Sequence, residues 1–478
     1  MDWQAQAPLF EALLRHTEKN TANLHIPGHR QGRVMPKELL QSGNNPFIFD
    51  LTELPGLDDL HNPQGAIQQA QELAAGLYGA DCSYFLVNGT STGLQALLMA
   101  VAGQKKVIIP RNAHRSVFGG LILAGAEPVY VMPELLPEFG LDCGVAPAML
   151  KQALAVDGSA AVLAVNPNYY GISGDLPGQV AVSHQADKSF LVDEAHGAHL
   201  RFHTSLPQDA MTAGADAAVQ STHKLGGSLG QSSVLHLKGP RIERQRIAAA
   251  LRLLQTTSPS YLLMASLDLA RRQLALKGNS LLSRSLELAW GLRRRLSRIK
   301  GLTVLSPELL PGHCAMDPGY VVISVRDLGL SGYQVQQLLA ERYQVFVEMA
   351  DSTNVLAIVS IGTSREDCQE LAGAMEDIAV RERTGRSISG LTMPTSFKVV
   401  LKPREAWYAD SCPVNLEEAA GKISAESVAV YPPGIPVINP GEEVTGEILD
   451  YLQEVRQKKI ACQGPADPTL KTIRVVVE

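Results

Sequence analysis

The chain lacks the long apolar runs of a membrane protein and the paired cysteines of a secreted disulfide scaffold. No window reaches the roughly 18 apolar residues of a membrane span, and the N-terminus has no basic start followed by an apolar run, so it does not resemble a signal peptide. The six cysteines lie far apart, without a C-x-x-C pair or a histidine at metal-ligand spacing. We therefore expect a cytoplasmic protein with free thiols, no membrane partner and no metal site.

Long basic runs are also absent, since 42 Lys and Arg residues accompany 48 Asp and Glu residues and the net charge is −6. The densest basic cluster, residues 293–298, is typical of the solvated face of a helix, so we expect no nucleic-acid partner. Hydrophobic residues make up 45% of the chain and charged residues 19%, which is typical of a soluble globular protein. The length of 478 residues allows about three domains.

From about residue 64, short apolar runs alternate with helical patterns. The predicted strands are residues 83–87, 107–109, 128–131, 161–165, 190–192 and 217–219, and the predicted helices between them include 67–78, 93–101 and 117–124. Strands separated by helices predict an α/β fold with a mostly parallel sheet covered on both faces. In such sheets ligands bind beyond the carboxyl ends of the strands, so the polar residues there are the candidates for chemistry.

The second half of the chain repeats this alternation on a smaller scale. A long helical pattern over 262–300, with a break predicted at Lys277-Gly278, precedes strands predicted at 321–325, 345–347 and 356–360 and helices predicted at 332–342 and 444–458. We predict four parts: an N-terminal arm (1–35), a large cofactor-binding domain (36–290), a small α/β domain (291–384) and a C-terminal domain (385–478).

The first polar cluster at a strand end is Asn88-Gly-Thr-Ser-Thr-Gly93. Its glycines permit a tight turn, its hydroxyls can donate hydrogen bonds, and a helix N-terminus adds free N–H groups and a positive dipole end. This combination suits a phosphate group. Ordinary N-capping by Ser or Thr is the alternative interpretation.

A histidine and a lysine follow two other predicted strands. His114, within Arg111-Asn-Ala-His-Arg-Ser116, can stack as a neutral imidazole on a flat heteroaromatic ring, or it can be a hydrogen-bonded structural residue. Lys224, within Gln220-Ser-Thr-His-Lys-Leu-Gly-Gly-Ser228, lies among hydroxyls and glycines. An amine at such a place has the shiftable pKa that Schiff-base chemistry requires, and Ser221 or Thr222 can reach a phosphate. A surface lysine is the alternative.

Asp193 ends the strand predicted at 190–192, where a buried carboxylate requires a cationic partner. A protonated pyridine nitrogen is such a partner. A capping role and a divalent-metal site with Glu194, His196 or His199 are the alternatives, although Asp-Glu-x-His matches no common metal signature.

Phosphate turn, stacking histidine, buried aspartate and Schiff-base lysine are together the parts of a pyridoxal-phosphate (PLP) site. Asp193 and Lys224 are 31 residues apart (from 193 to 224), which fits one strand-helix-strand unit and predicts that they lie at neighbouring strand ends.

The chain resembles the Orn/Lys/Arg decarboxylase family, PLP enzymes of the aspartate-aminotransferase fold (fold type I), over nearly its whole length. The stretches that carry the resemblance are His25–His29, Asp50–Leu60, Val87–Thr92, Arg111–His114, Val192–Gly197, Ser221–Lys224, Thr257–Tyr261 and Tyr431–Pro436. The chain is similar to the shorter branch that has no N-terminal wing domain. It departs from the family pattern at Leu225 and at Leu229-Gly-Gln231.

The resemblance implies a role for each matching residue. It assigns the cofactor phosphate to Thr90, Ser91 and Ser221, ring contacts to His114 and Ala195, the pyridinium to Asp193, covalent attachment to Lys224, and places near the cofactor to His196 and His223. It also implies that Thr256, Thr257 or Ser258 reaches the phosphate of a neighbouring subunit, so we expect a homodimer or a higher homo-oligomer with shared active sites.

The implied reaction is α-decarboxylation of a basic amino acid, arginine first and lysine second, with Lys224 or His223 returning a proton to Cα. A cationic side chain requires a carboxylate in the pocket, and the candidates are Glu53, Asp58, Glu348, Asp351 and Glu426. Two alternatives remain: another fold-type-I reaction, such as transamination with Arg365 holding a carboxylate, or aldol cleavage; and a non-catalytic regulator that keeps the fold.

Overall fold

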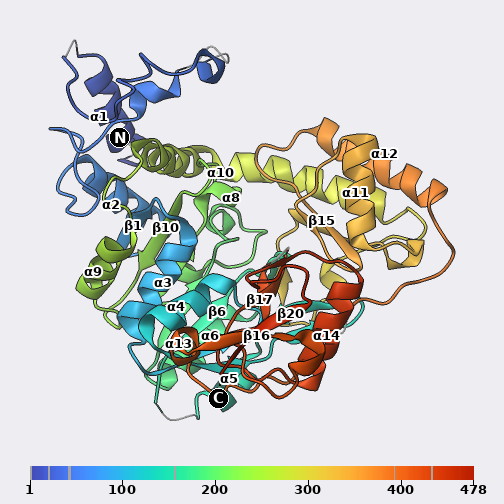
Figure 1. Cartoon of the computed structure of the whole chain (residues 1–478). Helices are drawn as coiled ribbons and strands as arrows, with labels where there is room; N and C mark the ends of the chain where they lie inside the picture. Colours follow the sequence, from blue (N-terminus) through green and yellow to red (C-terminus); the bar gives the residue numbers. More distant parts are fainter. Residues whose placement is uncertain are drawn as a thin grey trace.

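A seven-stranded sheet forms the centre of the computed structural model, which describes residues 3–19, 22–40, 45–155, 158–391, 393–431 and 434–477 (Figure 1). The strand order is β1-β10-β9-β8-β6-β2-β3. The bounds are Cys82–Leu86 (β1), Lys106–Pro110 (β2), Glu127–Val131 (β3), Ser159–Val165 (β6), Ser189–Asp193 (β8), Ala217–Gln220 (β9) and Ser233–Leu237 (β10). Only β10 runs against its neighbours, so the prediction of a mostly parallel sheet is confirmed, while β10 itself was not predicted.

Helices cover both faces of this sheet because its strands are buried on both sides; every residue of β8, for example, is buried. On one face lie α3 (Gly89–Val101), α4 (Arg115–Ala124) and α9 (Arg244–Leu254). The other face packs against α5 (Pro147–Ala153), α6 (Leu176–Gln185) and α7 (Ala210–Ala213). At the β1 edge, α1 (Pro8–Thr17) and α2 (Ala66–Tyr78) pack against the start of α10.

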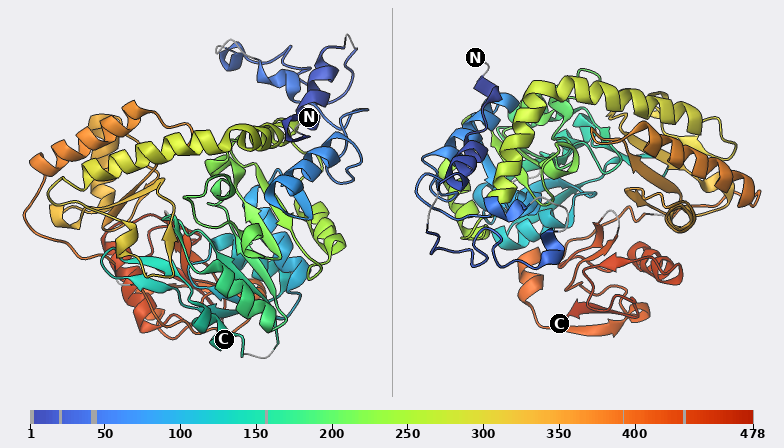
Figure 2. Two further views of the ribbon diagram at one scale, coloured as in Figure 1. Left: turned by 180° about the vertical axis from the view of Figure 1, so that it is seen from behind. Right: turned by 90° about the horizontal axis from the view of Figure 1, so that it is seen from above.

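Helix α10 (Tyr261–Leu296) connects the large sheet to a smaller one, as both views of Figure 2 show. It is continuous over 36 residues, so the predicted break at Lys277-Gly278 is wrong. A Cβ atom on Gly278 would lie 3.0 Å from the Phe202 side chain. The glycine therefore allows close packing within a helix, and tertiary contacts outweigh its low helix propensity.

The smaller sheet, in the order β11-β13-β15-β14, is entirely antiparallel. Its strands are Thr303–Val304 (β11), Tyr320–Ser324 (β13), Met349–Ala350 (β14) and Asn354–Ile358 (β15), and its helices are α11 (Gly332–Tyr343) and α12 (Arg365–Arg381). The strand predicted at 345–347 is wrong, because these residues are irregular and Phe346 is 80% exposed. Val345 and Val347 pack partly buried against the core of this region, and Phe346 between them faces solvent.

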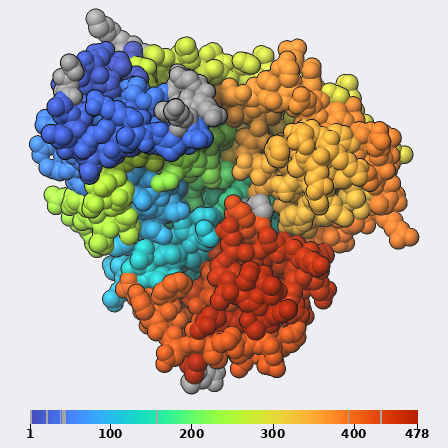
Figure 3. Space-filling view, turned by 45° about the horizontal axis from the view of Figure 1, so that its top comes forward, coloured from blue at the N-terminus to red at the C-terminus, as the bar shows by residue number. Residues whose placement is uncertain are grey.

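The C-terminal segment (residues 393–431 and 434–477) packs beside the large sheet and adjoins the smaller-sheet region, and together with the N-terminal residues these parts surround a central recess (Figure 3). It contains α13 (Pro403–Tyr408), α14 (Gly446–Gln457), the pair β16 (Ser411–Asn415) and β20 (Thr472–Val476), and the sheet of β18 (Ile435–Ile438), β17 (Val428–Val430) and β19 (Cys462–Gln463). Pro432 and Pro433 of the family motif lie outside the described residues.

Short elements complete the fold: β4 (Glu134–Leu136) pairs with β5 (Leu141–Gly144), β7 (Ile172–Ser173) pairs with β12 (Ala315–Met316), and α8 (Thr222–Leu225) follows β9. No helix among the described residues is both long enough and apolar enough to cross a membrane.

Candidate functional site

Asp193 and Lys224 lie at the carboxyl ends of adjacent parallel strands. Asp193 ends β8 and is paired in register with Val219 of β9, and α8, which carries Lys224, begins two residues after β9 ends. Asp193 is 4% exposed and accepts a hydrogen bond from the Ala195 N–H at 3.2 Å. Among the described residues it forms no ion pair, and Lys224 is the charge that acts on it. Burial raises the pKa of Asp193 to about 6, although the charge of Lys224 opposes the rise.

The Lys224 side chain is exposed, yet desolvation by the surrounding protein lowers the pKa of its amine, against the opposing charges of Asp193 and Glu348. Its Nζ atom donates to His196 Nε2 at 2.8 Å. Because that nitrogen accepts, the proton of the neutral imidazole is on Nδ1, which donates to the Tyr320 hydroxyl oxygen at 2.8 Å. Burial and Lys224 both lower the pKa of His196, which keeps the ring neutral. The Lys224 amine is thus positioned by a hydrogen bond to an oriented histidine, and not by an ion pair with a carboxylate.

A cluster of three hydroxyls lies at the N-terminus of α3. Thr90 Oγ1 is 2.6 Å from Ser221 Oγ and 2.9 Å from Ser233 Oγ, and all three residues are buried. Ser91 is exposed beside them. The N-cap residue of α3, Asn88, makes no side-chain capping bond, so the Ser and Thr hydroxyls do not cap this helix. Hydroxyls next to an uncapped helix N-terminus fit an anion such as a phosphate.

His114 caps the start of α4 and lies close enough to Lys224 for the two charges to interact. Its Nδ1 atom accepts from the Ser116 N–H at the start of α4 and lies 2.7 Å from Ser116 Oγ. Burial, followed by the charges of Lys224 and Arg115, lowers the pKa of His114 to about 4. The ring is therefore neutral at physiological pH, as stacking on a heteroaromatic ring requires.

The other residues implied by the resemblance lie around this centre. His223 Nδ1 donates to the Ser232 carbonyl at 2.9 Å, and burial lowers the pKa of His223. Thr256, Thr257 and Ser258 are exposed on the surface of the chain. The Thr256 carbonyl accepts from His61 Nε2 at 2.8 Å, which fixes this exposed segment against the body of the chain.

Three of the five candidate carboxylates are already engaged within the chain. Asp58 accepts five backbone N–H bonds, from residues 59, 64, 65, 67 and 68, and so fixes the start of α2. Glu426 accepts from the backbone N–H groups of Ala466 and Arg474 inside the C-terminal segment. Asp351 accepts from the Tyr170 hydroxyl and from Asn354. These three carboxylates therefore bind groups of the chain itself, which leaves them less suited to a substrate. The sequence alone does not distinguish such structural carboxylates from one that binds a substrate.

Glu348 and Glu53 are the two candidate carboxylates that remain for binding the substrate side chain. Glu348 is exposed, and its charge acts on both Lys224 and Tyr320, which places it near these two residues. Glu53 is exposed and accepts from the Thr52 hydroxyl.

The residues of the alternative metal site have other partners. Glu194 accepts from the Ala210 N–H and the Gln220 amide, each at 2.7 Å, and His199 pairs with Asp317 at 2.7 Å. Within the described ranges, no group of three His, Cys, Asp or Glu side chains is placed to hold a metal ion.

Two members of the site were not predicted from the sequence. Tyr320, which fixes the tautomer of His196, comes from β13 of the smaller sheet, and Ser233, which completes the hydroxyl cluster, begins the antiparallel strand β10. Neither residue lies in a local sequence motif. Their contacts with the site depend on how distant parts of the chain pack together, which the sequence does not show.

The buried charge of Asp193 predicts a stability change. A pKa raised from 3.8 to about 6 means that this carboxyl stabilises the cofactor-free fold below pH 4 and that this contribution is lost as pH rises through 6. Asp193→Asn should therefore make the cofactor-free protein more stable at pH 8, by about 2–3 kcal/mol. Urea unfolding of both proteins at pH 4 and pH 8 measures this, and an Asn variant that is equally stable or less stable at pH 8 would contradict it.

Comparisons with known proteins agree with this geometry. The family described as Orn/Lys/Arg decarboxylase, major domain, matches residues 7–367, and the corresponding C-terminal domain matches residues 390–464. The chain is 41% identical to an arginine decarboxylase of Bacillus subtilis over 483 residues, covering 99% of each chain. It is 39% identical to an arginine decarboxylase of Bacillus anthracis over 483 residues, covering 99% of this chain and 98% of that one.

Among solved structures, lysine decarboxylase A from Pseudomonas aeruginosa superposes with a TM-score of 0.87 at 21% identity, covering 99% of this chain and 81% of that one. The fold is therefore that of the aspartate-aminotransferase-like (fold type I) enzymes, with a large mostly parallel sheet and smaller C-terminal parts, as the sequence predicted.

Proposed function

Because the chain belongs to the Orn/Lys/Arg decarboxylase family, we propose that it is a PLP-dependent enzyme that removes the α-carboxylate of arginine as carbon dioxide and forms agmatine. Lysine, which would give cadaverine, is the second candidate substrate. The observation that carries the proposal is the convergence of the Lys224 amine and the buried Asp193 carboxylate from adjacent strand ends.

The donor set fits PLP at each of its functional groups. The hydroxyls of Thr90 and Ser221 at the N-terminus of α3 suit the phosphate, with Ser91 at its open side. The buried Asp193 carboxylate requires a cationic partner, and a protonated pyridine nitrogen provides one. The neutral His114 ring and Ala195 are suited to the two faces of the ring, and Lys224 is the amine that would bind the aldehyde carbon.

PLP, when bound, supplies the electron sink that accepts the electron pair of the broken bond between Cα and the carboxylate. Asp193 would hold a proton on the ring nitrogen by its charge, a form of electrostatic stabilisation that often dominates catalysis. The Lys224 amine would hold the cofactor and would be the group that carries a proton to Cα. His196 accepts a hydrogen bond from Lys224 and so keeps that amine oriented. His223 is the second candidate proton donor.

A guanidinium substrate requires an anionic partner at the recess, and we assign this role to Glu348, with Glu53 as a further candidate from the N-terminal region.

Hydrogen bonds to charged groups are worth about 1.5–3 kcal/mol. Glu348→Gln should therefore raise the KM for arginine by about tenfold or more and leave cofactor binding unchanged. Steady-state kinetics beside the control Glu341→Gln, an exposed glutamate on α11, measures this, and an unchanged KM would exclude Glu348.

We propose that the enzyme acts in the cytoplasm as a homodimer or a higher homo-oligomer. Thr256, Thr257 and Ser258 are exposed and ordered, so Thr257 can reach the phosphate site of a second copy. The six cysteines are all free, which fits a reducing compartment.

Product analysis tests the proposed reaction. The purified holoenzyme is incubated with equal arginine, lysine and ornithine, and the amines and carbon dioxide are quantified. We expect agmatine to be the main product. A keto acid in place of an amine would indicate transamination, for which the exposed Arg365 at the start of α12 would be the carboxylate ligand, and no turnover would indicate a regulator.

A further inference from the structure

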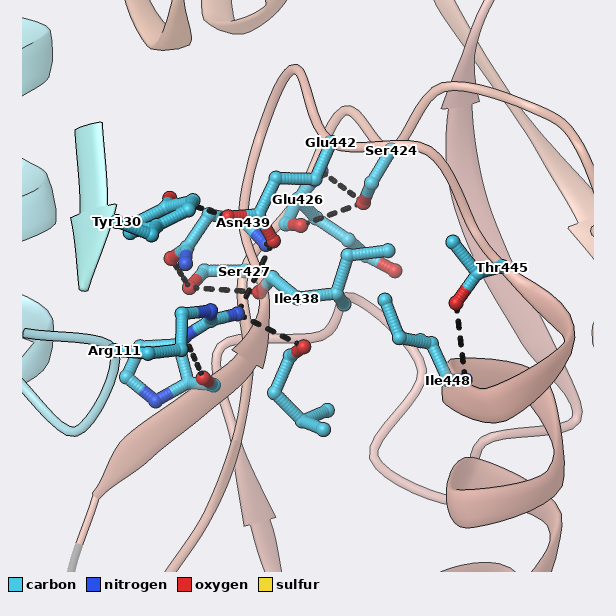
Figure 4. Close-up of polar contacts among 12 residues, drawn as sticks. Arg111, Tyr130, Ser424, Glu426, Ser427, Ile438, Asn439, Glu442, Thr445 and Ile448 are labelled. Atoms are coloured by element: carbon cyan, nitrogen blue, oxygen red, sulfur yellow. Dashed lines mark hydrogen bonds and ion pairs between the residues drawn. The ribbon is translucent and has the colours of Figure 1, made fainter. Parts of the chain in front are cut away.

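The residue that opens the His114 loop is bound to the C-terminal segment. The buried Arg111 guanidinium donates to the carbonyls of Pro436 (2.5 Å) and Val437 (3.0 Å) in β18, and to Glu442 Oε2 (3.2 Å). Arg111 and Glu442 are 3% and 1% exposed. Figure 4 shows Arg111 and Tyr130 from the large-sheet region meeting Glu442 and Asn439 from the C-terminal segment.

Glu442 is the centre of this contact and binds groups from both sides of it, while Arg111 Nε and Asn439 Nδ2 are buried without a hydrogen-bond partner among the described residues. Glu442 accepts from the Tyr130 hydroxyl through its second oxygen and from the Asn439 N–H at 2.9 Å. Burial beside Glu442 raises the pKa of Tyr130 well above its ordinary value, so the hydroxyl stays protonated and donates. The guanidinium carbon lies 3.9 Å from the ring centre of Phe397 and 5.1 Å from that of Tyr130, within the range of cation–π attraction.

The hairpin held in this way reaches the candidate active site. Strands β17 and β18 pair at Val430 and Ile435, and the Gly434 N–H donates to the Val430 carbonyl at 3.0 Å, so Gly434 lies at the end of this strand pair. A Cβ atom on Gly434 would lie 3.8 Å from both Cδ2 and Nε2 of His114. Arg111 and His114 belong to the same short turn after β2, which is closed by the bond from the Ala113 N–H to the Pro110 carbonyl at 3.1 Å.

We propose that Arg111 and Glu442 are positioning residues that hold β18 and the adjacent Gly434 against His114, so that the C-terminal segment forms a wall of the cofactor pocket. A buried ion pair adds little net stability compared with a well-packed apolar contact. Its directional bonds fix one geometry, and here they fix the turn that carries the ring-stacking histidine. Through this contact, the placement of the C-terminal segment sets the position of His114.

Hydrogen–deuterium exchange and kinetics of the holoenzyme together test this. Arg111→Met keeps the unbranched stem and removes the bonds, so we expect faster exchange in residues 111–117 and 434–438, no change in 320–358, and a kcat/KM lower by on the order of 100-fold. Arg111→Lys should recover part of this loss, because its ammonium can still donate to the carbonyls. Arg404→Met is the matched control, since Arg404 also donates across the same interface, to the Ile122 and Leu123 carbonyls, but away from the His114 turn.

The inference rests on the proposed decarboxylation only for its kinetic arm, and the exchange arm is independent of the reaction. Should Arg111→Met fail to fold, Glu442→Gln, which keeps the shape and removes the charge, decides the question by the same two readouts. Unchanged exchange around His114 in the folded variants, or equal losses in Arg404→Met, would overturn the proposal. A wild-type protein without decarboxylase activity would instead count against the proposed function alone.

Discussion

Lys224→Ala is expected to abolish the absorbance of covalently bound cofactor near the visible edge and to lower kcat by on the order of 10⁴-fold or more, since general acid–base catalysis alone contributes about 10²–10⁴-fold. Under the proposed mechanism, the variant would lack both the attachment point of the cofactor and the amine that carries the proton to Cα. His196 remains in place but has no group to orient. Absorbance spectra and carbon dioxide release measure the two effects.

The control for this variant is Lys277→Ala, which removes an exposed lysine on α10 and should leave spectrum and rate unchanged. A Lys224→Ala protein that retains the wild-type spectrum and rate would remove Lys224 from the mechanism. Free PLP bound noncovalently by the variant would not have this effect, because its spectrum differs from that of the lysine-linked cofactor.

Asp193→Asn is expected to lower kcat by about 10²–10³-fold, the usual loss when one preorganised electrostatic group is removed. The amide keeps the shape of the carboxylate but cannot hold the ring nitrogen in its protonated form. Cofactor binding through the Thr90 and Ser221 hydroxyls and through Lys224 should persist, so the loss should appear in kcat at full cofactor occupancy. Stopped-flow and steady-state rates at saturating PLP measure it.

Asp193→Glu provides the comparison, because it keeps the charge and shifts its position. We expect it to be more active than the Asn variant. Equal activity of Asp193→Asn and the wild type at saturating PLP would contradict the assigned role. Together with the stability gain predicted for the cofactor-free Asn variant, a loss of rate would mean that this carboxylate costs the fold free energy at neutral pH in return for catalysis.

The central sheet and the Asp193–Lys224 pair could be predicted because each depends on local patterns. An apolar strand that ends in a polar residue puts that residue at the carboxyl edge of a parallel sheet, and one strand-helix-strand unit makes two such edges neighbours. This reasoning placed Asp193 and Lys224 at neighbouring strand ends, as the structure has them, with Asp193 paired to Val219 of β9 and Lys224 in α8 just beyond that strand.

Features that depend on tertiary contacts could not be predicted. Gly278 suggested a helix break, but its lack of a side chain accommodates Phe202. The capping role of Asp58 depends on a turn whose backbone groups converge on its carboxylate, and no property of the residue itself reveals this. Tyr320 reaches His196 from another sheet, and the contact of Arg111 with β18 spans more than 300 residues.

Borohydride reduction of the holoenzyme, followed by peptide mass spectrometry, tests the central claim most directly, because it fixes the cofactor to the lysine that carries it. The predicted result is a pyridoxyl group on Lys224 in the peptide that contains Ser221 and His223. A pyridoxyl group on any other lysine, or on none, would contradict the account.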